Sequence, residues 1–171
     1  MTVREITPAP ISADAFAPYG ELIYASDASR ASMNDARFDR YRDLANIDVA
    51  DGGGQVSISI ARCRKPSEFP YTIGMLECHP HGSQAFIPLT PFAFIVVVAP
   101  SGENVDENRI TAFVTDGTQG INYRKGVWHM PMIATQQGQQ FLIIDRAPSA
   151  DNLREVKLDS PLSLLEPPHN G

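Results

Sequence analysis

The sequence predicts an all-β fold, a sandwich or barrel built from many short strands. Three observations support this. Short segments rich in β-branched and aromatic residues recur along the 171-residue chain, its 14 prolines and 12 glycines are spread between those segments, and one segment near the N-terminus has a helical pattern. Short strands separated by turn residues are typical of sandwiches and barrels rather than of alternating βαβ units. We therefore expect a single domain over residues 1–171, with a short N-terminal helix and a loose C-terminal tail.

The helix is expected over residues 12–20, where Ser12 is a suitable N-cap and Pro18 and Gly20 end the pattern. Strands are expected at residues 21–25, 37–44, 55–63, 71–77, 83–89, 92–99, 110–115, 120–123, 128–134 and 141–145. Turn residues separate most of them, for example at 51–54, 89–91, 100–102, 116–117 and 137–138.

Two of these segments have an informative pattern. In the third, Val56, Ile58 and Ile60 alternate with serines, as in a strand with one buried face. Residues 92–98 instead form an unbroken apolar run, so both faces of that strand should be covered. We expect a second copy of the chain to contribute to this cover and form a homodimer; the alternative is that the domain's own second sheet does so.

Composition excludes several classes of partner. The net charge is −6 and the pI is near 5.1, whereas binding to nucleic acid or to an anionic membrane needs a basic face. The longest apolar run, residues 92–100, is too short to span a bilayer, and no secretory signal is recognisable. Cys63 and Cys78 do not form a disulfide framework or a zinc motif. We expect a cytoplasmic protein with reduced thiols.

Histidines mark the candidate site. Residues 76–89 and 120–132 contain His79, His81 and His129, whereas His169 lies in a polar tail where no role is expected. Alternate side chains of an extended segment point to one face, so His79 and His81 should both face the interior. Imidazole is a common metal ligand and transfers protons near neutral pH. The spacing is that of cupin-like double-stranded β-helix (jelly-roll) barrels, which predicts a divalent metal bound by His79, His81 and His129.

A cupin metal site usually also has a carboxylate shortly after the histidine pair. The nearest candidate here is Gln84, whose amide oxygen is a weaker ligand.

The two segments resemble the ureidoglycolate lyase family, long called ureidoglycolate hydrolase. Residues 76–88 read Leu-Glu-Cys-His-Pro-His-Gly-Ser-Gln-Ala-Phe-Ile-Pro, and the family pattern is Leu-Glu-Arg-His-Pro-x-Gly-Ser/Thr-Gln-Ala-Phe-Ile-Pro. Residues 116–131 read Asp-Gly-Thr-Gln-Gly-Ile-Asn-Tyr-Arg-Lys-Gly-Val-Trp-His-Met-Pro, close to the family's second motif. Weaker similarity at residues 15–20, 40–45, 58–62 and 144–146 extends the resemblance over nearly the whole chain. Cys78, Arg124 and Met130 depart from the residues that the family usually has, and His81 stands where it often has Leu.

The resemblance implies a cupin-like homodimer that cleaves ureidoglycolate to glyoxylate and urea in allantoin and purine nitrogen catabolism. It also implies a divalent metal, for which we would name nickel. His129, His79 and Tyr123 are the expected catalytic residues. The expected substrate-binding residues are Arg40 and Arg62, for the carboxylate, and Gln84, Asn122 and Trp128.

Two alternatives stay open. The first is another metal-dependent cupin enzyme acting on a small carboxylate, such as an isomerase or an oxygenase; an oxygenase would need iron and a carboxylate ligand, which Gln84 does not provide. The second is a non-catalytic barrel that binds a small molecule, which the departures at Cys78 and Met130 allow.

Overall fold

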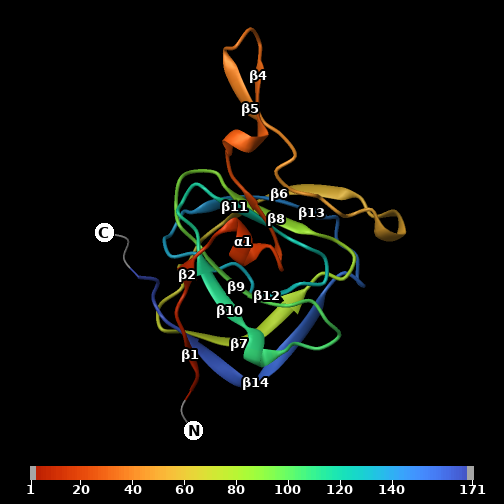
Figure 1. The fold of residues 1–171 in the computed structure, drawn as a ribbon. Helices are drawn as coiled ribbons and strands as arrows, with labels where there is room; N and C mark the ends of the chain where they lie inside the picture. The colour runs from red at the N-terminus through yellow and green to blue at the C-terminus, as the bar shows by residue number, and fades with distance from the viewer. Residues whose placement is uncertain (1–2, 169–171) are drawn as a thin grey trace.

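The computed structural model describes residues 3–168. Two curled sheets face each other, and a two-stranded hairpin projects from one of them (Figure 1). The strands are β1 (Glu5–Ile6), β2 (Ala9–Pro10), β3 (Gly20–Ile23), β4 (Arg30–Met33), β5 (Phe38–Tyr41), β6 (Val56–Arg62), β7 (Tyr71–Cys78), β8 (Gln84–Pro88), β9 (Ile95–Ala99), β10 (Thr111–Val114), β11 (Gly120–Tyr123), β12 (Trp128–His129), β13 (Gln140–Arg146) and β14 (Arg154–Leu164).

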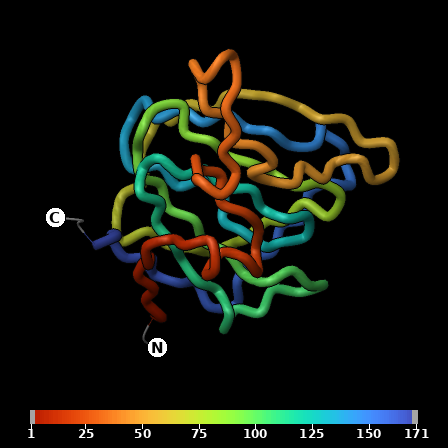
Figure 2. Tube along the Cα trace, turned by 45° about the horizontal axis from the view of Figure 1, so that its top comes forward, coloured from red at the N-terminus to blue at the C-terminus, as the bar shows by residue number. Residues whose placement is uncertain are grey.

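The larger sheet has the order β1-β14-β7-β12-β9-β10-β2, and the smaller sheet has the order β3-β11-β8-β13-β6. Nearly all of the pairs are antiparallel; only β1 and β2 join the larger sheet in parallel. The tube view shows the same two curled layers from a second direction (Figure 2). This architecture confirms the expected all-β, cupin-like fold.

The expected helix is present but short. Helix α1 (Ala13–Phe16) begins after Ser12, whose hydroxyl accepts a hydrogen bond from the backbone N–H of Ala15 at 3.2 Å. Phe16 is fully buried in a hydrophobic cluster between the two sheets. Three single 3₁₀ turns, at residues 27–29, 51–53 and 107–109, complete the helical structure described. No helix in residues 3–168 is long and apolar enough to cross a membrane.

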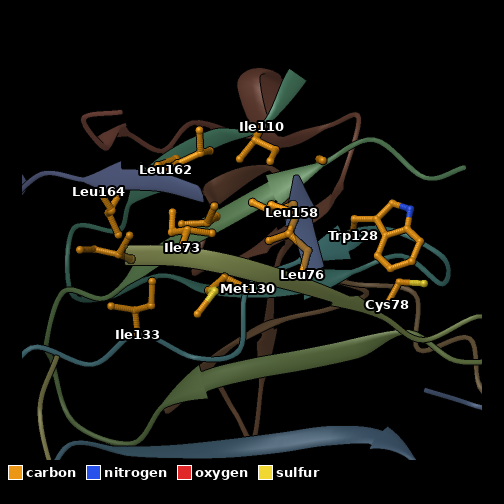
Figure 3. Close-up of a cluster of buried hydrophobic side chains, with 14 of the residues drawn as sticks. Ile73, Leu76, Cys78, Ile110, Trp128, Met130, Ile133, Leu158, Leu162 and Leu164 are labelled. Carbon is orange, nitrogen blue, oxygen red and sulfur yellow. The ribbon is translucent and has the colours of Figure 1, made fainter. Parts of the chain in front are cut away.

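Strand β9 carries the apolar run, and both of its faces are buried by this chain alone. Ile95, Val97 and Ala99 belong to a cluster enclosed by the curl of the larger sheet, together with residues of β7, β12 and β14 (Figure 3). Val96 and Val98 face the other way, into a second cluster between the two sheets. The run therefore gives no argument for a homodimer, because the chain's own sheets cover it.

Three details of the expected pattern are wrong. The 11-residue strand β14 was not expected, because Asp159, Ser160 and Pro161 interrupt its apolar pattern; the structure places them in a bulge between Lys157 and Leu162. Of the expected strand 128–134, only the first two residues form a strand, β12. The expected strand 37–44 is the shorter β5, paired with β4 in a hairpin that was not foreseen.

The alternating strand β6 is also oriented differently from the expectation. Val56, Ile58 and Ile60 are 56%, 68% and 63% exposed, so the apolar face points outward. Strand β6 is an edge strand of the smaller sheet, paired only with β13.

Candidate active site

Two rows of polar side chains face each other across the space between the sheets. In the larger sheet, Glu77 on β7 lies opposite His129 on β12. In the smaller sheet, Asp145, Gln84 and Tyr123 lie side by side on β13, β8 and β11. Directly paired residues of neighbouring strands point to the same face, so each row presents its side chains together. Tyr123 joins the two rows, since its ring stacks on that of His129 with a centroid distance of 4.3 Å and an interplanar angle of 14°.

Glu77, His79 and His129 form the centre of this arrangement. Carboxylate Oε1 of Glu77 is 3.5 Å from Nε2 of His129 and 4.0 Å from Nε2 of His79. One ligand atom from each of the three side chains lies within 4.8 Å of the others. A carboxylate and two imidazoles are a ligand set used for divalent metal ions.

Backbone carbonyls fix the orientation of both imidazoles. Nδ1 of His79 lies 2.8 Å from the carbonyl oxygen of Asn152, and Nδ1 of His129 lies 3.0 Å from that of Val127. A carbonyl can only accept, so Nδ1 carries the proton in both rings and Nε2 of a neutral ring has a free lone pair. Both Nε2 atoms are buried and have no hydrogen-bond partner among the described residues. Such carbonyl contacts are the usual support of metal-ligating histidines, so these residues fit a metal ion.

Burial and charge set the protonation of the neighbouring groups. Burial, and secondly the charge of Glu77, raise the pKa of Tyr123, which therefore remains a neutral phenol at physiological pH. Burial alone would raise the pKa of Glu77, but the attraction of its carboxylate to His129 and His79 in their protonated form outweighs burial and lowers that pKa. The site therefore presents a carboxylate acceptor and a phenol donor.

Gln84 offers a second polar contact. Its amide Nε2 donates to Oδ2 of Asp145 at 3.3 Å, which assigns the amide orientation. The remaining oxygen, Oε1, is buried without a partner among the described residues. An unpaired buried acceptor is costly, so this oxygen suits a ligand that brings an N–H group.

A cavity of about 240 Å³ adjoins the cluster at His79. Asp145, Asn152, Arg146 and Leu153 are among the residues that line it. A larger cavity, of about 500 Å³, is lined by other segments such as Ser67 and Asp116 and contains none of the three cluster residues. We regard the smaller cavity as the approach to the site because its lining includes His79, a member of the cluster.

His81 is not brought to the cluster. Strand β7 ends at Cys78, and the chain then turns through Pro80, so the two-residue alternation does not continue to His81. Its imidazole Nε2 is 3.7 Å from the exposed carboxylate of Asp151. His169 lies outside the described residues.

Four of the expected substrate-binding residues also lie away from the cluster. Asn122 precedes Tyr123 on β11 and faces the opposite side, where its amide donates to Glu21 and to the carbonyl of Asn46. Trp128 faces the enclosed cluster of the larger sheet and donates to the carbonyl of Gly102 (Figure 3). Arg40 is on the projecting hairpin, and Arg62 ends β6 beside a different cavity.

Sequence reasoning missed Glu77 and Asn152. A signal for Glu77 was present, since it lies at the end of β7, two residues before His79, the spacing that places side chains of an extended chain on one face. Asn152 lies in the connection between β13 and β14, outside both motifs, and its local sequence shows nothing that marks it.

Comparisons with known proteins agree with the resemblance. The family model for ureidoglycolate lyase matches residues 3–165. A ureidoglycolate lyase of Burkholderia mallei (strain NCTC 10229) is 45% identical over 157 residues, covering 92% of this chain and 91% of the relative. Those of Pseudomonas syringae pv. tomato and Pseudomonas fluorescens (strain Pf0-1) are 41% and 38% identical, over 90% and 98% of this chain and 89% and 99% of the relatives.

Proposed function

The chain belongs to the ureidoglycolate lyase family, and we propose that it cleaves ureidoglycolate into glyoxylate and urea. The observation that carries this proposal is the meeting of Glu77, His79 and His129 beneath Tyr123. The net negative charge of the chain disfavours nucleic acid as a partner, and the partner that we propose is a small-molecule substrate.

The reaction needs one proton removed and one delivered. One carbon of ureidoglycolate carries a hydroxyl, a carboxylate and the urea nitrogen. The hydroxyl proton leaves as its C–O bond becomes the C=O of glyoxylate, the C–N bond breaks with its electron pair going to nitrogen, and that nitrogen gains a proton. Atoms balance without water, so the reaction is an elimination.

The cluster suits the first transfer and Tyr123 the second. Unprotonated Nε2 atoms of His79 and His129 and the ionised carboxylate of Glu77 can each accept a proton. Because its pKa is raised, Tyr123 stays protonated until the leaving nitrogen, which is strongly basic, takes its proton. The free Oε1 of Gln84 matches the N–H groups of the ureido end.

The same three residues suit a divalent ion as an alternative to the role of base, because a lone pair that ligates an ion cannot also accept a proton. Nickel is the first ion that we would test. When bound, such an ion supplies a Lewis acid that lowers the pKa of the substrate hydroxyl. The ligand set that we propose is Glu77, His79 and His129, with the histidines held by the carbonyls described above.

We also propose that the protein is a homodimer in the cytoplasm. Its two cysteines, Cys63 and Cys78, are free thiols, which fits a reducing compartment.

The test is product analysis with racemic ureidoglycolate. We expect urea and glyoxylate in equal amounts, with one enantiomer consumed. Ammonia in place of urea would indicate an amidohydrolase and contradict the proposal. Binding of substrate without turnover, with several divalent metals supplied, would favour the non-catalytic barrel.

A further inference from the structure

Asp145 is a carboxylate of the site that the proton transfers do not use. It lies on β13 opposite Gln84 of β8, which in turn lies opposite Tyr123 of β11, and these three strands are neighbours in the smaller sheet (Figure 1). Directly paired residues point to the same face, so Asp145 faces the larger sheet, as Tyr123 does. Asp145 and His79 line the same cavity of about 240 Å³. A small ligand that contacts His79 in this cavity can therefore also reach Asp145.

The carboxylate of Asp145 has few partners within the chain. Its Oδ2 accepts a hydrogen bond from Nε2 of Gln84 at 3.3 Å, and its Oδ1 takes part in no hydrogen bond with residues 3–168. No lysine, arginine or histidine of that part of the chain forms an ion pair with it. The adjacent Arg146 donates instead to the backbone carbonyls of Val49 and Asp51. Both oxygens of a carboxylate can accept, so this half-buried group has unused acceptor capacity.

Gln84 adds a second acceptor beside the first. Because its Nε2 is directed to Asp145, the atom that remains is Oε1, which is buried without a partner among the described residues. Two acceptors that lack donors therefore lie together on neighbouring strands. Buried acceptors are normally paired, so this pair suits a ligand group that carries several N–H bonds.

From these observations we infer that Asp145, with Gln84 beside it, binds the terminal NH₂ of the ureido group and makes the site specific for a primary ureido group over an acyl group. The inference rests on the proposed function, since it specifies how one end of that substrate is recognised. All N–H bonds of ureidoglycolate are on its ureido end, which matches the two acceptors. Its other end is a carboxylate, which the like charge of Asp145 repels. Asp145 therefore also determines which end of the substrate lies at β13.

A compound without the terminal NH₂ leaves the carboxylate of Asp145 unpaired. Replacing that NH₂ with a methyl group gives an N-acyl compound of nearly the same size and shape, so the volume of the cavity cannot distinguish the two. The difference between them is a hydrogen bond to a charged acceptor. Losing one such bond lowers affinity about 10–100-fold.

Two unreactive ligands isolate this difference. Ureidoacetate is the substrate without its hydroxyl group, and N-acetylglycine is ureidoacetate with a methyl group in place of the terminal NH₂. Both keep the carboxylate and the inner N–H, so a contribution from a bound ion is common to both. Calorimetry measures their dissociation constants with the full-length chain, in wild type and in Asp145→Asn. This substitution keeps the volume and one oxygen that can accept from Gln84, but it replaces the second acceptor with an N–H donor.

Asp151→Asn is the matched control. It removes the same charge from the connection that follows β13, but the side chain of Asp151 is 70% exposed and its carboxylate lies 3.7 Å from His81, away from the cluster. Circular dichroism melts verify the folding of both variants.

We expect wild type and Asp151→Asn to bind ureidoacetate at least about 10-fold more tightly than N-acetylglycine. In Asp145→Asn the affinity for ureidoacetate should fall about 10–100-fold, whereas that for N-acetylglycine should not fall, so the preference disappears. A wild type that binds the two ligands equally, or binds neither, would overturn the inference. A variant that loses affinity for both ligands in equal proportion would also overturn it, because Asp145 would then only hold Gln84 in place.

These outcomes are separable from those of the product analysis. A wild type that prefers ureidoacetate but releases no urea from ureidoglycolate would support the role of Asp145 and refute the lyase function. Release of urea by a protein that binds the two ligands equally would do the reverse.

Discussion

Asn152 provides the sharpest test of how the site is held. It is 8% exposed, its backbone carbonyl accepts from Nδ1 of His79 at 2.8 Å, and its side-chain Oδ1 accepts from the backbone N–H of His81 at 2.9 Å. Replacing Asn152 with Leu keeps a similar volume but removes the Oδ1 acceptor. The N–H of His81 is left unpaired, which should cost about 1–3 kcal/mol of stability. The turn that positions the carbonyl of Asn152 against His79 also loses the hydrogen bond that holds it to residue 81.

We expect that His79 occupies a single tautomer in the wild type and no longer does so in the variant. Long-range ¹H–¹⁵N spectra of the wild type should show the proton on Nδ1 of both His79 and His129. In Asn152→Leu, His79 should become a mixture of tautomers, and nickel affinity should fall about 10–100-fold, the usual effect of losing support for a ligand.

The same spectrum contains the control. His129 is held by the carbonyl of Val127, so its tautomer should not change in the variant. Asn152→Asp keeps an acceptor oxygen, so in this variant the proton of His79 should stay on Nδ1, as in the wild type. If Asn152→Leu melts lower but leaves His79 on Nδ1–H, then Asn152 is only a structural residue and the reasoning fails.

Further substitutions test the remaining members of the site and the fold around it. His129→Asn should melt normally and lower turnover by roughly 10²-fold or more, measured by single-turnover urea release; a lower melt with normal turnover would remove His129 from the site. Tyr123→Phe should reduce turnover by a similar factor with little change in substrate affinity, and an unchanged kcat would exclude it as the proton donor. Glu77→Gln should abolish stoichiometric nickel binding, as seen by calorimetry, if the carboxylate is a ligand. Gly20→Ala should destabilise the fold by about 1–3 kcal/mol in denaturant melts, because its Cβ would come within 1.8 Å of the carbonyl oxygen of Asn122.

Much of the fold could be predicted because its strands are local patterns bounded by turn residues. The capped start of α1 and the buried strand β9 illustrate this, since Ser12 and the apolar run each determine structure within a few residues. Strand β14 could not be predicted in the same way. Its polar interruption is accommodated by a bulge, and its pairing with β7 joins residues about eighty positions apart.

The site was predictable only where the backbone stays extended. His129 and His79 do lie together, with ring centroids 5.4 Å apart. The alternation argument placed His81 beside them, but it fails beyond His79 because the turn at Pro80 and His81 redirects the chain. The same argument, applied backwards from His79, would have found Glu77.

The two motifs serve two purposes, which explains why resemblance alone assigns roles poorly. Inward-facing Gln84 and Tyr123 contribute to the site, whereas their chain neighbours Ser83 and Asn122 bind Asp48 and Asn46, in the segment that follows the β4–β5 hairpin. Successive residues of a strand face opposite sides, so one short motif can determine both the chemistry inside the barrel and the anchoring of the segment that follows the β4–β5 hairpin. A motif residue's place in this alternation, rather than its membership of the motif, therefore indicates whether it can reach the substrate.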